Sequence, residues 1–218
     1  MKKKSGWTAV LFMLTVLTVF AGMRSLQNRQ DLVYAQALEK VAVSIDKKEL
    51  TLYDMAFYVA YQEKEVQKDA VIYNPEKPYR YWNAHTNGAF IRVVAEKAIV
   101  DMAVHDEIFY QMACKEELVL DEREIEYLAN EIADFCSDVT EEQLAQLGVT
   151  AEDMKDAMYK IALANKYQSI LAQIENRDYT EYDYTGSAYA DLLAGYIIEV
   201  NENVWDRISV GNITVNYK

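Results

Sequence analysis

The longest regular pattern of apolar positions lies in the middle of the chain, between Ala84 and Leu120. Apolar side chains recur there at the three- and four-residue spacing of one helix face, at Phe90, Val94, Ala98, Met102, Ile108, Phe109 and Met112. A second row at Ile91, Ala95 and Ile99 widens this stripe. No glycine or proline interrupts residues 89–120. The pattern therefore predicts a central helix of about 28 residues, roughly 42 Å long, against which shorter helices pack.

Four further helices are marked by capping boxes at their starts. The boxes pair Thr51 with Asp54, Asp121 with Glu124, Thr140 with Gln143 and Thr150 with Asp153. We expect the first of these helices to run to about Lys68 and the third to end at Leu147-Gly148. The second should turn Ile125, Leu128, Ile132 and Phe135 inward, and the fourth carries apolar residues from Met154 to Ile174. The body is therefore predicted to be mainly α-helical.

A small β-sheet is predicted from the two ends of this body. Val41–Ile45 alternates in the manner of a short strand and is followed by a turn at residues 46–49. After helical segments near Ala188–Leu193 and Val204–Ile208, we predict that the tail ends in a strand at Ile213–Tyr217. An isolated strand is not stable in water. We therefore expect Val41–Ile45 to pair either with Ile213–Tyr217 or with the earlier apolar run Tyr196–Val200.

Both prolines of the chain, Pro75 and Pro78, lie in the stretch Asp69–Gly88, which predicts a long irregular connection. Most of the 17 tyrosines suit packing in cores and interfaces. Four large rings beside two prolines are harder to bury together. We predict that these rings bind a ligand, and they belong to Tyr73, Tyr79, Tyr81 and Trp82. The alternative is that they pack on the helices and only stabilise the fold.

The N-terminus has the pattern of a targeting segment. Three lysines at residues 2–4 precede an apolar run, Trp7–Met23, which Arg24 closes. This arrangement is typical of a signal anchor or a cleaved signal peptide, and no cysteine follows the run for lipid attachment. We expect an uncleaved transmembrane anchor at residues 1–24, a polar stalk at 25–40, and a body on the extracytoplasmic side of the cell membrane. Secretion after cleavage is the alternative.

Charge narrows the choice of partners. The chain has a net charge of -13, and residues 1–40 hold six of its 22 basic residues but only two of its 35 acidic residues. The remainder, with 16 basic and 33 acidic residues, is therefore strongly anionic. Such a surface repels nucleic acid and anionic lipid, so neither is an expected partner of the body.

The sequence contains no recognisable set of catalytic or metal-binding residues. Only two histidines occur, His85 and His105, and there is no HExxH or paired-cysteine motif, so we expect no metal and no cofactor. Asp101 and His105 are four residues apart, which suits an exposed pair on a helix surface better than a carboxylate that orients a catalytic imidazole. Cys114 and Cys136 are predicted to remain separate thiols, because a helical hairpin turning near residue 119 would place Cys114 opposite residues near 124.

The order of these parts resembles the chaperone module of SurA and of the PrsA foldases, which is also related in shape to the trigger-factor lobe. The resemblance rests on the strand–turn–helix opening VAVSIDKKELTLYDMAFYV, the long helix ending AEKAIVDMAVHDEIFYQMACKEELVL, and the capped segment LDEREIEYL. It covers residues 40–175 and the tail. Asp46-Lys47 stands where the family usually has Asn-Gly. The family's isomerising members insert a parvulin domain before the C-terminal segment, whereas here only the polar stretch 176–187 stands in that place, too short for a folded domain.

The resemblance implies a helical chaperone-like domain at residues 41–175, followed by a linker and a C-terminal segment at 176–218 that packs back on it. It implies a non-catalytic protein that binds unfolded or extended client polypeptides outside the cytoplasm. A dedicated partner-binding component of a secretion or surface-polysaccharide assembly is the first alternative. A degenerate prolyl isomerase or a glycan-active enzyme is a further alternative.

Overall fold

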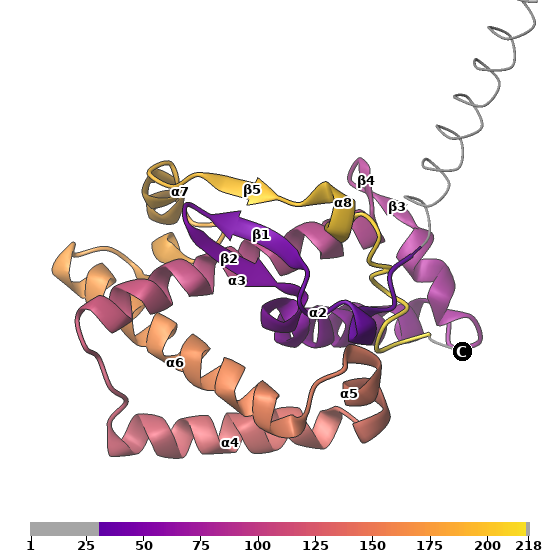
Figure 1. The fold of residues 1–218 in the computed structure, drawn as a ribbon, viewed down its shortest axis with the longest axis horizontal. Coiled ribbons are helices and arrows are strands. Elements are labelled where there is room, and N and C mark those ends of the chain that lie inside the picture. The colour runs from indigo at the N-terminus through magenta and orange to yellow at the C-terminus, as the bar shows by residue number, and fades with distance from the viewer. Residues whose placement is uncertain (1–30, 217–218) are drawn as a thin grey trace, which may run out of the picture.

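The computed structural model describes residues 31–216. They form a mainly helical body with a small antiparallel sheet, as the sequence predicts. In Figure 1 the sheet lies along one side of helices α2 and α3, α4 lies along the opposite side, and α6 runs obliquely between α3 and α4. The helices are α2 (Leu52–Tyr73), α3 (Ile91–Lys115), α4 (Glu122–Asp138), α5 (Glu141–Leu147), α6 (Ala151–Ile174), α7 (Ser187–Leu193) and α8 (Glu202–Trp205). The 3-10 helices are η1 (Tyr34–Gln36), η2 (Pro78–Asn83) and η3 (Tyr179–Tyr182).

Helix α3 is the centre of the core, as predicted, and it packs most extensively on α6 and α2. Its buried face includes Ala95, Ile99 and Phe109, each at most 1% exposed. The start of the predicted stripe is an exception, because Phe90 and Val94 are 52% and 49% exposed. Helix α3 also contacts η2 and the short strand β4 (Ala89–Phe90), which directly precedes it in the chain.

All four predicted capping boxes are confirmed. At the start of α4, the Glu124 amide donates to Asp121 Oδ1 at 3.0 Å, and the Asp121 amide donates to Glu124 Oε2 at 2.7 Å. Gly148 ends α5 with a φ of 72°. Ile125 was expected to point inward but is 51% exposed. The apolar contact of α4 with the neighbouring helices begins at Leu128 and continues at Ile132. The first turn of α4 is tied to α6 by a polar contact instead, between Glu124 and Lys166 Nζ at 2.6 Å.

The larger sheet has the strand order β2-β1-β5, with both pairings antiparallel. Strand β1 (Val41–Ile45) forms a hairpin with β2 (Lys48–Thr51) and pairs on its other edge with β5 (Ile198–Val200). Of the two partners considered for the first strand, the apolar run Tyr196–Val200 is therefore the one that pairs. The strand predicted at Ile213–Tyr217 does not form over its described part, residues 213–216.

The polypeptide after α8 binds α2 in another way. We call residues 209–216 the C-terminal strap. Glu63 of α2 is fully buried beneath it, and its Oε1 accepts hydrogen bonds from the amides of Gly211 (2.5 Å) and Ile213 (3.2 Å). Its Oε2 accepts from the amide (2.5 Å) and the hydroxyl (2.6 Å) of Thr214. The strap thus gives its amide hydrogens to a carboxylate, which is why it does not form a strand.

The connection between α2 and α3 is also more regular than predicted. Helix α2 continues to Tyr73 rather than ending near Lys68, and Pro78 begins η2, where proline's missing amide hydrogen is no loss. Strands β3 (His85–Thr86) and β4 then form a hairpin around Asn87-Gly88, whose φ angles are 49° and 89°. An Asn-Gly pair with positive φ at both residues is the preferred two-residue hairpin turn. The prediction of a long irregular connection at Asp69–Gly88 is therefore wrong.

Residues 176–187 and the described part of the predicted stalk, residues 31–40, pack on the body instead of serving as connections. In the stretch 176–187, expected to be a linker, Tyr182 is 3% exposed and its hydroxyl donates to Glu175 at 2.5 Å. In the predicted stalk, the amide of Leu32 donates to the Arg207 carbonyl at 2.7 Å, and the buried Tyr34 hydroxyl donates to the Leu52 carbonyl at 2.5 Å. Both segments are polar in sequence, yet one is held by a side-chain carboxylate and the other by main-chain carbonyl groups.

The predicted anchor at residues 1–24 lies outside the described part of the chain. Within residues 31–216, no helix is both long and apolar enough to cross a bilayer.

Candidate functional site

A groove of about 730 Å³ opens among α2, α3, α4, α6 and residues 179–185. Aromatic side chains form much of its lining, and they are Phe57, Tyr58, Tyr61, Phe135, Tyr179 and Tyr184. Aliphatic and thioether groups add to it from Met102, Leu128, Met158 and Ile161. Because the lining comes from four different helices, the pattern of apolar residues in any one helix does not reveal the groove.

The aromatic lining is partly open to solvent. Phe57 of α2 contacts Phe135 of α4, with ring centroids 5.0 Å apart, and stacks on Tyr61 at 6.1 Å. Tyr61 is 39% exposed, and Tyr179 and Tyr184 are each 40% exposed. These rings are therefore held by neighbouring side chains while part of their surface stays accessible to solvent, as is common for rings that contact a ligand.

The groove is also anionic. Its carboxylates belong to Asp106, Glu131, Asp134, Asp138 and Asp183, whereas its only lysine or arginine is Lys64. Lys64 Nζ is bonded to Asp138 at 2.5 Å and lies 5.7 Å from the Phe135 ring centroid. None of the other four carboxylates forms an ion pair with a lysine or arginine of residues 31–216.

His105 lies at the base of the groove. The prediction that it forms an exposed pair with Asp101 is therefore wrong. His105 is 5% exposed, its Nδ1 is 2.7 Å from Asp106 Oδ1, and its Nε2 is 2.9 Å from the Tyr182 carbonyl oxygen. Asp101 pairs with Lys97 instead, four residues earlier on the same helix. Because both ring nitrogens of His105 already contact protein oxygens, neither is directed at a molecule in the groove. The histidine fixes η3 to α3.

Asp106 links this contact to α2. The Tyr58 hydroxyl also hydrogen-bonds to Asp106, and burial, followed by the charge of Asp106, raises the pKa of Tyr58 well above its ordinary value. Gln168, 1% exposed, donates to Asp183 Oδ1 at 2.9 Å and to the Tyr179 carbonyl at 3.2 Å. These buried polar contacts hold the base of the groove, while Glu131 and Asp134 on its α4 side form no ion pair within residues 31–216.

A second, smaller hollow of about 250 Å³ lies between α2, α3 and α6 and shares Phe57, Tyr58, Asp106 and Ile161 with the groove. Its edge is bridged by the Tyr53 hydroxyl, which donates to Asp153 Oδ1 at 2.6 Å. This bond raises the pKa of Tyr53 to about 12 and lowers the pKa of Asp153.

The Tyr53–Asp153 contact predicts a pH-dependent effect of Tyr53→Phe. Because the folded-state pKa of Asp153 is depressed, its contribution to stability is present above its unfolded pKa and is lost as pH falls through the folded value. We expect the variant to be less stable than the parent by about 1 kcal/mol or less at neutral pH, since the contact is exposed and screened. The difference should shrink below about pH 4. Urea unfolding at neutral and acid pH measures it, and a difference that grows toward acid would contradict the assignment.

The four rings predicted to bind a ligand separate into two environments. Trp82 is 1% exposed and its indole Nε1 donates to Gln67 Oε1 at 3.1 Å. Trp82 is therefore part of the core, and the prediction that it contacts a ligand is wrong. The reason is that the C-terminal strap covers the indole, a contact no local pattern predicts.

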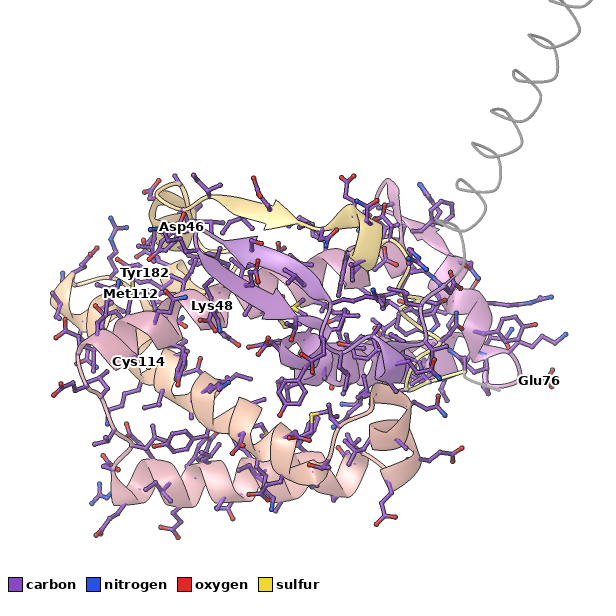
Figure 2. All side chains as sticks on the ribbon, viewed as in Figure 1. Asp46, Lys48, Glu76, Met112, Cys114 and Tyr182 are labelled. Atoms are coloured by element: carbon purple, nitrogen blue, oxygen red, sulfur yellow. The ribbon has the colours of Figure 1, made fainter. Side chains whose placement is uncertain are left out.

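The other three rings come from the end of α2 and from η2, and Tyr73 and Tyr81 contact one another. Tyr73 and Tyr79 are 63% and 49% exposed, and the Tyr73 and Tyr81 ring centroids are 5.3 Å apart. Glu76, between them in the sequence, marks this end at the right of Figure 2, opposite the side where Tyr182 and Cys114 lie. We call Tyr73, Tyr79 and Tyr81 the tyrosine end. It is a second candidate surface, without the concavity of the groove.

The cysteines and the groups that could bind a metal complete the predicted sites. Cys114 and Cys136 are both free, as predicted. In residues 31–216, no three His, Cys, Asp or Glu side chains are arranged to hold a metal ion.

The fold and the groove together define a mainly helical protein with a small sheet and a concave, aromatic and acidic surface. Comparison with family models, with curated proteins and with solved structures finds no match to this chain.

Proposed function

We propose that this protein is a non-catalytic binding protein of the helical chaperone type, which holds unfolded or extended polypeptide in the groove between α2, α4 and α6. The observation that supports this proposal most directly is the groove lining, which combines the partly exposed rings of Tyr61, Tyr179 and Tyr184 with methionine and leucine side chains. Aromatic and thioether groups adapt to many apolar partners. The resemblance of the sequence to the SurA and PrsA chaperone module favours the same kind of function.

The location proposed for this activity is the extracytoplasmic side of a cell membrane, with residues 1–24 as a single anchor. The lysines before the apolar run and the absence of a nearby cysteine support it. In the second version of the proposal, the same anchored body binds one dedicated partner in a secretion or surface-polysaccharide assembly. The exposed tyrosine end favours that version, because exposed aromatic side chains commonly dominate the binding of one complementary partner.

Two variants distinguish which of the two candidate surfaces binds polypeptide. Tyr61→Ala removes a ring from the groove, and Tyr79→Ala removes a ring of similar exposure from the tyrosine end. Binding of the full-length chain to a labelled, permanently unfolded polypeptide is measured by fluorescence anisotropy. Removing an aromatic contact of a binding site costs about 2 kcal/mol, so we expect Tyr61→Ala to weaken binding by tenfold or more and Tyr79→Ala to leave it unchanged.

Melting temperatures serve as the control, because both side chains are partly exposed and both variants should remain folded. Loss of binding in Tyr79→Ala alone would move the site to the tyrosine end. The absence of any binding to unfolded polypeptide by the parent would contradict the chaperone-type function.

A further inference from the structure

The charge and shape of the groove narrow the kind of polypeptide segment that fits it. Glu131, Asp134 and Asp138 are three and four residues apart on α4, so they share one face of the helix. At a rise of 1.5 Å per residue they form a row about 10 Å long. All three belong to the groove lining. An occupant of the groove therefore meets a line of carboxylates along one wall.

Two of these carboxylates have no cationic partner in the described chain. Asp138 is bonded to Lys64, but Glu131 and Asp134 form no ion pair within residues 31–216, and Glu131 receives only a hydrogen bond from the neutral Tyr127 hydroxyl. Both residues are exposed and neither packs in the core. Their charges are thus available to a ligand without loss of a structural contact.

The α2 wall differs from the α4 wall. It presents Phe57 and Tyr61, while its one cation, Lys64, is already engaged with Asp138. Side chains of an extended chain point alternately to opposite sides, so residues two apart face the same wall about 6.6 Å from one another. An alternating sequence of basic and apolar residues would place its cations along α4 and its apolar groups against α2. Aromatic faces also attract cations that reach them.

We infer that the groove selects extended polypeptide segments in which lysine or arginine alternates with apolar residues, an inference that rests on the proposed polypeptide-binding function. An acidic segment would face repulsion from the α4 row and would have no free cation of the groove to pair with. Charge complementarity of this kind governs selectivity and is weakened by salt. Affinity for the basic segment should therefore fall as ionic strength rises.

The test compares two labelled peptides of equal length and equal apolar content, one alternating lysine with leucine and phenylalanine, the other with glutamate in place of each lysine. Fluorescence anisotropy measures their binding to the full-length chain at low ionic strength. We expect the lysine peptide to bind at least about tenfold more tightly, a difference of about 1.4 kcal/mol. The double variant E131Q/D134N should abolish most of this preference while leaving the melting temperature unchanged.

The matched control is E126Q/E199Q, which alters the net charge by the same amount at exposed positions outside the groove. It should keep the preference. If it removes the preference as fully as E131Q/D134N does, the net charge of the whole protein is responsible and the inference is wrong. If both peptides bind equally and both weaken in Tyr61→Ala, the inference fails while the proposed function stands. If neither peptide nor any unfolded polypeptide binds, the proposed function fails with it.

Discussion

Replacing Glu63 with glutamine is expected to lower the free energy of unfolding by about 1–3 kcal/mol, the cost of leaving a buried hydrogen-bond donor without its partner. Each oxygen of the Glu63 carboxylate accepts two hydrogen bonds, four in all, from Gly211, Ile213 and Thr214. Glutamine keeps one acceptor oxygen but replaces the other with an amino group, which faces donors at hydrogen-bond distance. At least one buried donor set therefore loses its partner, although the shape of the side chain is retained.

A matched control for this change is Glu65→Gln on the same helix. Glu65 pairs with Lys68 on the surface, so losing its charge should cost about 1 kcal/mol or less. Urea unfolding of the parent and both variants gives the comparison. Equal effects of the two substitutions would show that the buried carboxylate does not hold the strap to α2.

The pKa of Glu63 is raised by burial, and the hydrogen bonds from Thr214, Gly211 and Ile213 oppose that rise. Since a raised folded-state pKa favours the protonated form, this group contributes least to stability at pH values above its folded pKa. The hydrogen bonds from the strap thus offset the cost of removing the Glu63 carboxylate from water, so their net contribution to stability is smaller than their number suggests.

Gly211→Ala is the second substitution expected to be strongly destabilising, by about 2–5 kcal/mol when backbone strain and overpacking are added. Gly211 has a φ of 91°, a conformation that alanine adopts at a cost. An added Cβ would also lie 2.6 Å from two ring carbons of Trp82. The indole is buried and cannot move away without disturbing the core.

Gly88→Ala separates these two causes. Gly88 has nearly the same φ, 89°, but a Cβ there would meet no atom within 4 Å. We expect it to cost only the conformational strain, about 1–2 kcal/mol, and the excess in Gly211→Ala then measures the contact with Trp82. Thermal or urea unfolding of both variants tests this, and equal costs would refute the packing contribution.

Several parts of the fold could be predicted because their causes are local. The capping boxes at Thr51, Asp121, Thr140 and Thr150 each join groups three residues apart, so the residues that form them are visible in the sequence. The central helix is likewise determined by an uninterrupted periodic pattern. The strand Val41–Ile45 was predictable for the same reason, and its hairpin partner β2 is adjacent to it in the chain.

The groove could be predicted only in fragments. Leu128 and Phe135 were recognised as inward positions of one helix, and Met158 and Ile161 as apolar positions of another, but their meeting place depends on how α4 crosses α6 and α2. The acidic residues of α4 looked like an ordinary solvated face, because spacing alone does not show which exposed face borders a hollow. Tyr61 carried no signal that distinguished it from the other tyrosines.

Contacts over long sequence distances were decided by the tertiary structure alone. Glu63 and Lys64 are adjacent and both charged, yet one is buried under the strap and the other pairs with Asp138 in the groove. The sequence predicted His105 on the surface and Trp82 in a ligand site. In the structure, His105 contacts Tyr182 and Trp82 contacts Gly211, both from distant parts of the chain. The sequence by itself determined where the helices begin and which strand opens the sheet, because those choices depend on neighbours within a few residues. Only the packed structure decided which polar groups are buried, because burial depends on partners as much as 151 residues away.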